Sequence, residues 1–426
     1  MNLSRLLNNN LLRDSFWALL GNFLGKGLVL IAGIVVARFL GNESYGEYGM
    51  IRNNLTMIAI FSSLGLGYTA TKFIAEGKIH NPEQIYQTHK VVTHITCFFS
   101  SFIAFVVFIF AEPIASWLEA NELCYLLRLS AIAIVFNAIN ATQIGELAGL
   151  SAYKDIARNN VVAGFVTFLI SVIFTYLYNI DGAVFALVIS LFANCLLNRL
   201  SLSKYLKCIK IIRAQISDYK KIISFSLPIA LQESTYSVTH WLNTIILIKL
   251  AGYGELGIYS VATQWMAVML FIPGALRNVA LSHLSSNNDD VQKNKKMLMQ
   301  LIFVNVLGTV IPFLIIALLS EWICSWYGSS YYGLQRVLNI CMFTTIINSL
   351  TNVFTQNLIS LNQNWFVTIT QWVRDLSILL CAYLFIPLLE NGALVMAVIT
   401  LISQSVYLCL LLYKQYSLYS KLSVLI

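Results

Sequence analysis

Residues 38–48 read RFLGNESYGEY, and residues 249–259 read KLAGYGELGIY. The two stretches start 211 residues apart, and in each a glycine ends one apolar run before a second glycine and a tyrosine open the next. Because this spacing is about half of the 426 residues, the chain is predicted to be duplicated end to end. Duplicated membrane halves that run in the same direction are the usual plan of transporters that bind cargo near the middle of the bilayer.

The repeat continues beyond these turns. Leu147 and Leu150 correspond to Leu358 and Leu361 at the same spacing of 211 residues. A single spacing therefore relates distant parts of the two halves, as expected if a whole bundle of helices had been copied.

The composition places the chain in a membrane. Hydrophobic residues make up 58% of the sequence, charged residues 11%, and the mean hydropathy is +0.74, whereas soluble domains are about 45–50% apolar. A membrane-spanning helix needs about 20 mostly apolar residues, and the chain contains about twelve such runs. They cover residues 15–37, 48–68, 90–111, 124–149, 159–179, 182–201, 222–249, 257–280, 298–319, 335–360, 366–388 and 392–413.

Six predicted spans fall in each half. The runs are long and lack the alternation of barrel strands, so we predict an all-α polytopic membrane protein with two six-helix pseudo-symmetric halves around a central cavity. The halves are residues 1–201 and 222–426, and residues 202–221 form a basic linker. The first span is too long for a signal peptide and lacks an Ala-x-Ala cleavage site, so it is expected to remain as a helix.

Lysine and arginine are concentrated on one side of this topology. The formal net charge is +8, and the loops on the opposite side carry mainly acids. By the positive-inside rule, both termini are predicted to be cytoplasmic. Attraction to anionic lipid headgroups accounts for the basic linker, so membrane lipids are expected partners and nucleic acid is not. The densest basic group is Arg199, Lys204, Lys207, Lys210, Arg213, Lys220 and Lys221.

No sequence motif for enzymatic chemistry is present. The chain lacks a phosphate-binding glycine loop with lysine, an HExxH motif and a GxSxG motif. Its eight cysteines are scattered singly, without metal-ligand or redox spacing. We therefore expect a protein that is not an enzyme and has no catalytic residue, metal site or cofactor.

Lys26 and Glu233 lie at comparable depths in the first and seventh predicted spans. A charge inside the bilayer costs several kcal/mol unless it faces a watery cavity or a partner. We therefore predict that Lys26 attracts an anionic headgroup in the cavity and that Glu233 binds cargo, carries a coupling proton or balances Lys26. The alternative is a structural ion pair that joins the halves.

Four more ionisable residues bear on the site. Arg374 and Asp375 are adjacent, so their side chains point about 100° apart on a helix. We expect one to line the cavity and the other to pair sideways, and the alternative is a local polar clamp. His240 lies two turns from Glu233 and is predicted to relay protons, unless it only packs. Glu146, near the end of the fourth span, is expected to reach water.

Carboxamides gather on one face of the fourth and tenth spans. Their spacing of three and four residues places them on a common helical face. We predict that Asn140, Gln143, Asn352 and Gln356 line the cavity and bind sugar hydroxyls, and the alternative is that they only join helices. The full set is Asn137, Asn140, Gln143, Asn348, Asn352, Gln356 and Asn357.

Pro273 and Gly274 lie within the eighth predicted span. Proline interrupts the hydrogen-bond ladder of a helix and glycine removes side-chain restraint. We predict a hinge at this pair, and a static kink is the alternative.

The opening segment carries a resemblance to a known family. Residues 22–26 (NFLGK), 37–41 (ARFLG) and 45–48 (YGEY) resemble the N-terminus of the polysaccharide-export branch of the multidrug/oligosaccharidyl-lipid/polysaccharide (MOP) exporter superfamily. Residues 147–150 (LAGL), followed by Tyr153 and Lys154, resemble the end of its fourth span. With the twelve-span duplicated plan, the resemblance covers nearly the whole chain.

The resemblance implies an O-antigen flippase in a bacterial inner membrane. Such a carrier moves undecaprenyl-pyrophosphate-linked oligosaccharide repeat units from the cytoplasmic to the periplasmic leaflet by alternating access. The resemblance also implies a cationic cavity, which Lys26 fits, coupling to H⁺ or Na⁺, and work beside the O-antigen polymerase and chain-length regulator of lipopolysaccharide biosynthesis.

Two other functions remain open from the sequence. A drug or cation antiporter of the same superfamily would share the fold, but its cavity would favour acids and aromatics, and Lys26 argues against it. A membrane O-antigen polymerase would need a substantial outer loop with catalytic residues, whereas the predicted outer loops are short.

Overall fold

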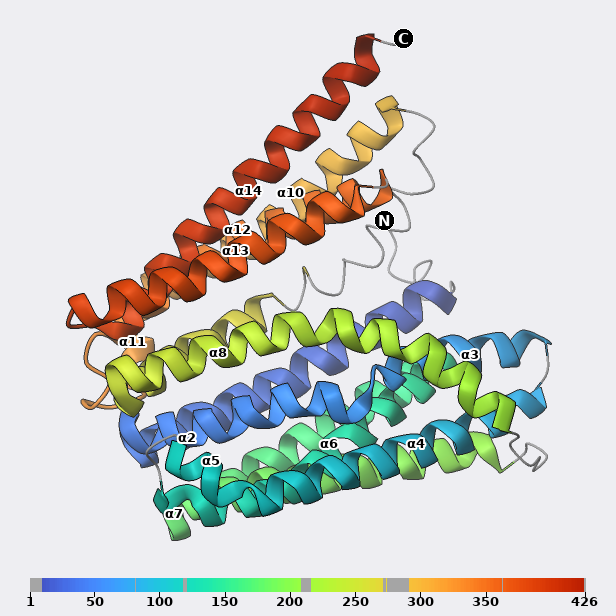
Figure 1. Ribbon diagram of the computed structural model, residues 1–426, viewed down its shortest axis with the longest axis horizontal. Coiled ribbons are helices and arrows are strands. Elements are labelled where there is room, and N and C mark those ends of the chain that lie inside the picture. The colour runs from blue at the N-terminus through green and yellow to red at the C-terminus, as the bar shows by residue number, and fades with distance from the viewer. Residues whose placement is uncertain are drawn as a thin grey trace. The chain divides into compact units, whose positions relative to one another are not determined.

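The computed structural model describes residues 10–80, 82–117, 121–207, 216–270, 273, 291–361 and 363–424. Every regular element in these residues is a helix, as Figure 1 shows. A helix satisfies its backbone hydrogen bonds within one segment, as the bilayer requires. The helices are α2 (Asn10–Ser63), α3 (Leu66–His80), α4 (Pro82–Ile109), α5 (Ala111–Trp117), η1 (Asn121–Leu123), α6 (Cys124–Gly149), α7 (Tyr153–Leu206), α8 (Ile216–Met269), α10 (Val291–Leu318), α11 (Ser320–Ser325), α12 (Leu334–Ser360), α13 (Asn364–Phe385), η2 (Ile386–Leu388) and α14 (Gly392–Val424).

Three of these helices each contain two predicted spans. Helices α2, α7 and α8 are each 54 residues long, which corresponds to about 80 Å and far exceeds the roughly 30 Å of hydrocarbon in a bilayer. Each is interrupted by non-helical backbone, at Gly41 in α2, at Tyr178 and Asn179 in α7, and at Gly252 in α8. Each long helix is therefore two successive helical segments separated by a non-helical residue or residue pair.

The described residues contain nine helices long and apolar enough to cross a membrane. Dividing α2, α7 and α8 at their interruptions adds three and gives twelve spans in the part of the chain that the structure describes. The predicted all-α polytopic fold is therefore confirmed.

Contacts divide the chain into two units. Unit 1 comprises Met1–Leu40 and Glu47–Trp241, and unit 2 comprises Gly41–Gly46 and Leu242–Ile426. In unit 1, α6 packs on α3, α4 and α7; in unit 2, α12 packs on α10, α13 and α14. The boundary between the units falls inside α8, so the first part of α8 belongs with the N-terminal helices.

The two glycine turns that mark the repeat share one backbone conformation. Gly41 has φ 73° and ψ 176°, and Gly252 has φ 87° and ψ 174°. A positive φ with extended ψ is essentially confined to glycine. The same residue type therefore produces the same bend in both halves.

The last glycine of each turn, Gly46 in the first and Gly257 in the second, allows a close approach within unit 2. A Cβ atom on Gly46 would overlap the carbonyl oxygen of Tyr253, and a Cβ atom on Gly257 would overlap that of Asn42. Asn42 and Tyr253 are themselves 211 residues apart. The contact is therefore reciprocal, as at a two-fold axis, and the two copies of the turn pack on each other.

Tyrosines fix the first turn to the rest of unit 2. The Tyr45 hydroxyl, fully buried, donates to Oε1 of Gln264 at 2.8 Å, and the Tyr331 hydroxyl donates to the carbonyl oxygen of Gly41 at 3.1 Å. Burial raises the pKa of Tyr331, which lies between candidate spans, well above its usual range. Its hydroxyl therefore remains a donor at any physiological pH.

Small residues allow close helix packing in unit 1. Helices α3 and α6 cross where Gly67 meets Gly145, and a Cβ atom on Gly145 would overlap the Gly67 carbonyl oxygen. The Thr71 hydroxyl donates to the carbonyl oxygen of Gly145 at 2.9 Å. Such small-residue crossings replace the hydrophobic effect as the source of helix association in lipid.

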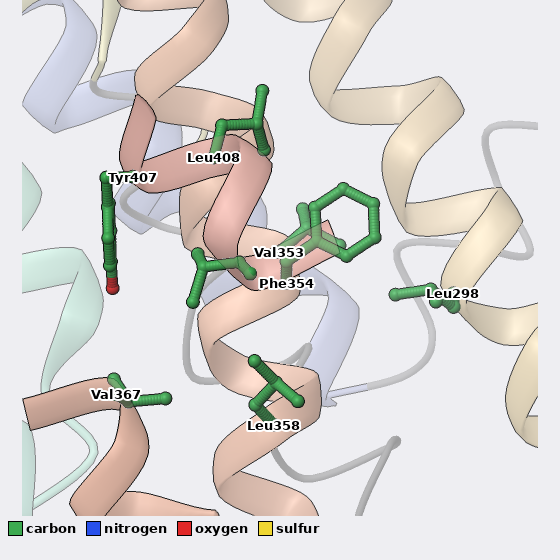
Figure 2. Packing of buried hydrophobic residues seen from close by; sticks show 8 residues of the cluster. Leu298, Val353, Phe354, Leu358, Val367, Tyr407 and Leu408 are labelled. Carbon is green, nitrogen blue, oxygen red and sulfur yellow. The ribbon is translucent and has the colours of Figure 1, made fainter. Parts of the chain in front are cut away.

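The core of unit 2 is apolar and is shown in Figure 2. Val353, Phe354 and Leu358 of α12 pack with Tyr407 and Leu408 of α14. Leu298 from α10 and Val367 from α13 complete the same cluster. Four helices of unit 2 therefore share one buried cluster, and in Figure 1 they lie side by side.

The outer surface of α4 is strongly apolar. Phe98, Phe102, Phe105 and Phe108 are exposed and recur at intervals of three and four residues, which places them on one helical face. An exposed phenylalanine stripe of this kind fits contact with lipid tails.

Replacing Gly252 by alanine tests whether positive φ defines the turn. No atom lies within 4 Å of a Cβ at Gly252, and the same is true of helical Gly27, so only backbone conformation distinguishes the two sites. We expect Gly252→Ala to lower the free energy of unfolding by about 1–3 kcal/mol. Gly27→Ala should leave it unchanged or raise it by up to about 1 kcal/mol. Thermal melting of the purified proteins measures both, and equal melting temperatures would contradict the assignment.

Candidate functional site

Arg374 and Asp375 of α13 pair with each other. Nε and Nη2 of Arg374 donate to Oδ1 of Asp375 at 2.8 and 2.6 Å, and both side chains are nearly buried. The expectation that the two point to different walls is wrong, because the long guanidinium side chain folds back across the helix surface. The alternative of a local polar clamp describes what the structure contains.

The clamp extends to two neighbouring helices. Nη1 of Arg374 donates to Oε1 of Gln404 in α14 at 3.3 Å, and the Gln404 amide donates to Thr351 of α12 at 3.0 Å. The guanidinium also lies over the ring of Tyr407, whose hydroxyl contacts Thr355. Two hydrogen bonds of the Gln404 amide and a cation–π contact of Arg374 thus join α12, α13 and α14, next to the charged pair on α13.

Asn140 belongs to a buried amide network in unit 1. Nδ2 of Asn198 donates to Oδ1 of Asn140 at 2.6 Å, and Nδ2 of Asn159 donates to Oδ1 of Asn198 at 2.9 Å. Ser201 closes the network against Asn159. The network joins α6 to α7, so Asn140 joins helices, as the alternative had it.

Gln143 and Glu146 lie one turn apart on α6 and are both buried. Gln143 is hydrogen-bonded to Cys195 of α7, and its Oε1 has no partner. Glu146 accepts from, or donates to, Nδ1 of His89 in α4 at 2.9 Å, and its other oxygen, Oε2, has no partner. The expectation that Glu146 reaches water is wrong, because α3, α4 and α7 enclose the end of α6 and leave only 1% of the side chain exposed.

The amides of α12 are also buried. Gln356 is 3% exposed with an unpartnered Nε2, and Asn357 is fully buried with both polar atoms unpartnered. Asn352 is half-buried. Unpartnered buried amides are costly, so this face of α12 has unused capacity for hydrogen bonds.

Lys26 lies on α2 beside a close helix crossing in unit 1. A Cβ atom on Gly25 would meet the Asn160 carbonyl oxygen of α7, and one on Gly164 would meet that of Gly25. The Lys26 side chain itself is exposed. The close approach of α2 and α7 sets the height and direction at which this lysine leaves its helix.

Two other predicted residues lie in the unit 1 part of α8. Glu233 is within the helix, but its side chain lies outside the described residues. His240 precedes Trp241, whose Nε1 donates to Oδ1 of Asn54 in α2. Lys26, Glu233 and His240 therefore belong to the same unit, and their roles remain predictions.

The predicted hinge is only partly described. Pro273 is helical and buried, whereas Gly274 lies outside the described residues. The hinge therefore remains a prediction. Among the described residues, no group of three or more His, Cys, Asp and Glu side chains is placed to hold a metal ion.

His89 is the residue that sequence reasoning missed. It lies near the start of α4 and has no neighbour in sequence that suggests a partner. The spacing of 211 residues offered a signal, because it makes Asn357 the counterpart of Glu146. A carboxylate in the first half and an amide at the corresponding position of the second mark Glu146 as a position where the halves differ in sequence.

The sequence of residues 11–275 matches the family model described as polysaccharide biosynthesis protein. The chain belongs to this family. The match covers more than half of the chain and confirms the resemblance to the polysaccharide-export branch carried by the N-terminal motifs.

The chain is similar in sequence to two informative proteins. It is 23% identical over 189 residues to the capsular polysaccharide biosynthesis protein CapF of Staphylococcus aureus, covering 44% of this chain and 48% of CapF. The chain thus spans about half the length of this relative. It is also 21% identical over 292 residues to the uncharacterized membrane protein MJ1375 of Methanocaldococcus jannaschii, covering 66% of this chain and 69% of that protein.

Solved structures show the fold of this family member. An inward-facing multidrug resistance MATE family transporter of the MOP superfamily superposes with a TM-score of 0.76 at 16% identity, covering 92% of this chain and 94% of that one. A MOP superfamily transporter from Pyrococcus furiosus, described as having a binding pocket of reverse polarity that suggests a different function, has a TM-score of 0.68 at 15% identity over 99% and 98%. The chain therefore has the MOP transporter fold.

The Arg374–Asp375 clamp makes a stability prediction. Arg374→Met leaves a buried carboxylate without its partner and should lower the free energy of unfolding by about 3–5 kcal/mol. The double variant with Asp375→Asn removes both charges and should recover most of that loss. Thermal melting in detergent measures the difference. A single variant with wild-type stability would show that the Arg374–Asp375 pair does not stabilise the fold.

Proposed function

We propose that the protein is a flippase for undecaprenyl-pyrophosphate-linked oligosaccharide repeat units, such as those of O-antigen. It moves them from the cytoplasmic to the periplasmic leaflet of a bacterial inner membrane by alternating access. A proton or sodium gradient supplies the energy.

One observation carries the proposal: a chain of a polysaccharide biosynthesis family has the fold of MOP transporters. Sugar repeat units are built on lipid carriers and are too polar to cross hydrocarbon unaided. A transporter fold in such a pathway therefore fits the step that moves the unit across the membrane. The capsular polysaccharide relative supports a polysaccharide cargo.

The site residues follow from this cargo. Lys26 attracts the pyrophosphate, and Glu233 and Arg374 are proposed as further substrate-binding residues. The amides Asn140, Gln143, Asn352 and Gln356 serve the glycan, directly or by holding their helices. Glu233, His240 and Asp375 are the proposed ion-coupling groups, and Pro273 with Gly274 is the proposed hinge.

Orientation and partners complete the proposal. The excess of Lys and Arg in alternate loops and the linker supports a cytoplasmic position for both termini. The O-antigen polymerase and chain-length regulator would receive the unit on the periplasmic side. Membrane lipids supply the surroundings of the carrier's polyprenyl tail.

A drug or metabolite antiporter is the second candidate. The likeness to a multidrug resistance MATE transporter favours it. The exposed Lys26 on α2 opposes it, because a lysine repels cationic cargo.

Surface O-polysaccharide in a strain deleted for the gene tests the proposal. The strain is complemented with wild type, Lys26→Ala or the charge-preserving control Lys26→Arg, with equal membrane expression. We expect wild type to restore surface polymer and Lys26→Ala to lower it at least about tenfold, because loss of a midplane cation weakens binding of the anionic headgroup. Lys26→Arg should retain more polymer than Lys26→Ala.

The site of accumulation separates the alternatives. Lipid-linked units held in the cytoplasmic leaflet of the deleted strain support a flippase. Single units on the surface without polymer would instead indicate a polymerase, and unchanged polymer would favour the antiporter.

A further inference from the structure

Near the end of α6 lies a buried carboxylate, Glu146, of which only one oxygen is hydrogen-bonded. Glu146 is 1% exposed, and its Oε1 lies 2.9 Å from Nδ1 of His89, which is 27% exposed. Its Oε2 has no hydrogen-bond partner. An ionised oxygen in this position loses its hydration without compensation, so the site favours an additional positive charge.

The helices packed on α6 place basic and neutral groups at or near this site. From α3, the Lys78 ammonium donates to the Leu150 carbonyl oxygen and Ser151, just beyond the end of α6. From α4 comes His89 itself. From α7, the positive charge of Arg199 acts on His89, and the Cys195 thiol is hydrogen-bonded to Gln143. The surroundings are thus basic at the rim and neutral inside, with Glu146 as the one acid among these groups.

The corresponding buried position in the copied half carries no acid. Asn357 of α12, 211 residues after Glu146, is also fully buried with unpartnered polar atoms. An uncharged amide therefore occupies the equivalent buried position in the second half. The carboxylate of the first half is then available for a role that an amide cannot perform, which is to bind and release a proton.

We propose that Glu146 and His89 form a further proton-binding site that couples transport to the proton gradient, beside the groups Glu233, His240 and Asp375 proposed above. The inference rests on the proposed transport function and deepens it. It assigns coupling to α4 and α6 of unit 1, at the end of the bundle that the charge distribution predicts to be cytoplasmic.

The proton balance is simple. Water delivers a proton to the accessible His89 ring while the proton on Nδ1 passes to Oε1 of Glu146, so one proton leaves water and one is gained by the carboxylate. Release reverses these steps. The protonated Oε1 then donates back to Nδ1, which has become an acceptor, and Oε2 is left as a neutral carbonyl oxygen, whose burial without a partner costs less than that of a carboxylate oxygen.

The chemistry of the pair favours a proton as the bound cation. Hard metal cations need about six or more oxygen ligands. Among the described residues, no cluster of three or more His, Cys, Asp and Glu side chains exists to provide them. A carboxylate bonded to one imidazole is instead suited to hold a single proton.

Infrared difference spectroscopy of the reconstituted full chain, between high and low pH, tests the site without any cargo. We expect a carbonyl band of a buried protonated carboxyl in wild type, and its loss in Glu146→Gln. The matched control Glu76→Gln removes an exposed acid from α3 and should keep the band. Varying Na⁺ at constant pH should leave the band unchanged.

Movement of a fluorescent undecaprenyl-pyrophosphate oligosaccharide in the same proteoliposomes supplies the second readout. An imposed pH gradient should accelerate it at least about tenfold in wild type and Glu76→Gln, equivalent to about 1.4 kcal/mol, and have no effect in Glu146→Gln. His89→Gln keeps the acid, and we expect it to slow the appearance of the Glu146 carbonyl band after a pH jump. This variant keeps the test valid if Glu146→Gln does not fold.

The outcomes separate this inference from the proposed function. A band that persists in Glu146→Gln, or one that Na⁺ removes, overturns the proton site. A band that behaves as expected in a protein that moves no oligosaccharide supports the site and overturns the proposed cargo.

Discussion

The fold depends on two glycine turns that only glycine can make and that pack on each other. Gly41 and Gly252 bend α2 and α8 through the same positive-φ conformation. Gly46 and Gly257 then let each turn rest on the carbonyl oxygen of the other copy. Backbone packed so closely leaves no room for adjustment, so these turns fix the direction of the helices that leave them. The duplication seen in the sequence is therefore a physical contact in the structure.

The scaffold is symmetric, whereas the polar chemistry placed on it is not. In unit 1, α6 carries an acid bonded to histidine, and an asparagine network joins it to α7. In unit 2, the equivalent position of α12 carries an amide, and a nearly buried charged pair lies instead on α13, in the Arg374–Asp375 clamp. Each buried polar group in a bilayer needs a partner or a function. The two halves have thus met this requirement differently, which is what a transporter needs if one half senses the ion gradient.

The sequence predicted the fold because its signals are long and repeated. Spans of about 20 apolar residues and a spacing of 211 residues leave few alternatives. Side-chain partners were harder to predict, because they depend on which helices meet. Glu146 is near a helix end and was expected to reach water, yet three neighbouring helices enclose it. Arg374 and Asp375 were assigned different directions from helix geometry, but the length of the arginine side chain lets it fold back onto its neighbour.

The most direct test of the account is transport by the purified protein alone. The chain is reconstituted in liposomes that contain a fluorescent undecaprenyl-pyrophosphate oligosaccharide, and an added lectin reports which glycans are on the outer leaflet. The account predicts that the protein exchanges glycans between leaflets well above the rate in protein-free liposomes. Two results together would contradict this function and identify an antiporter: glycan exchange no faster than in protein-free liposomes, and uptake of a fluorescent cationic drug by the same proteoliposomes.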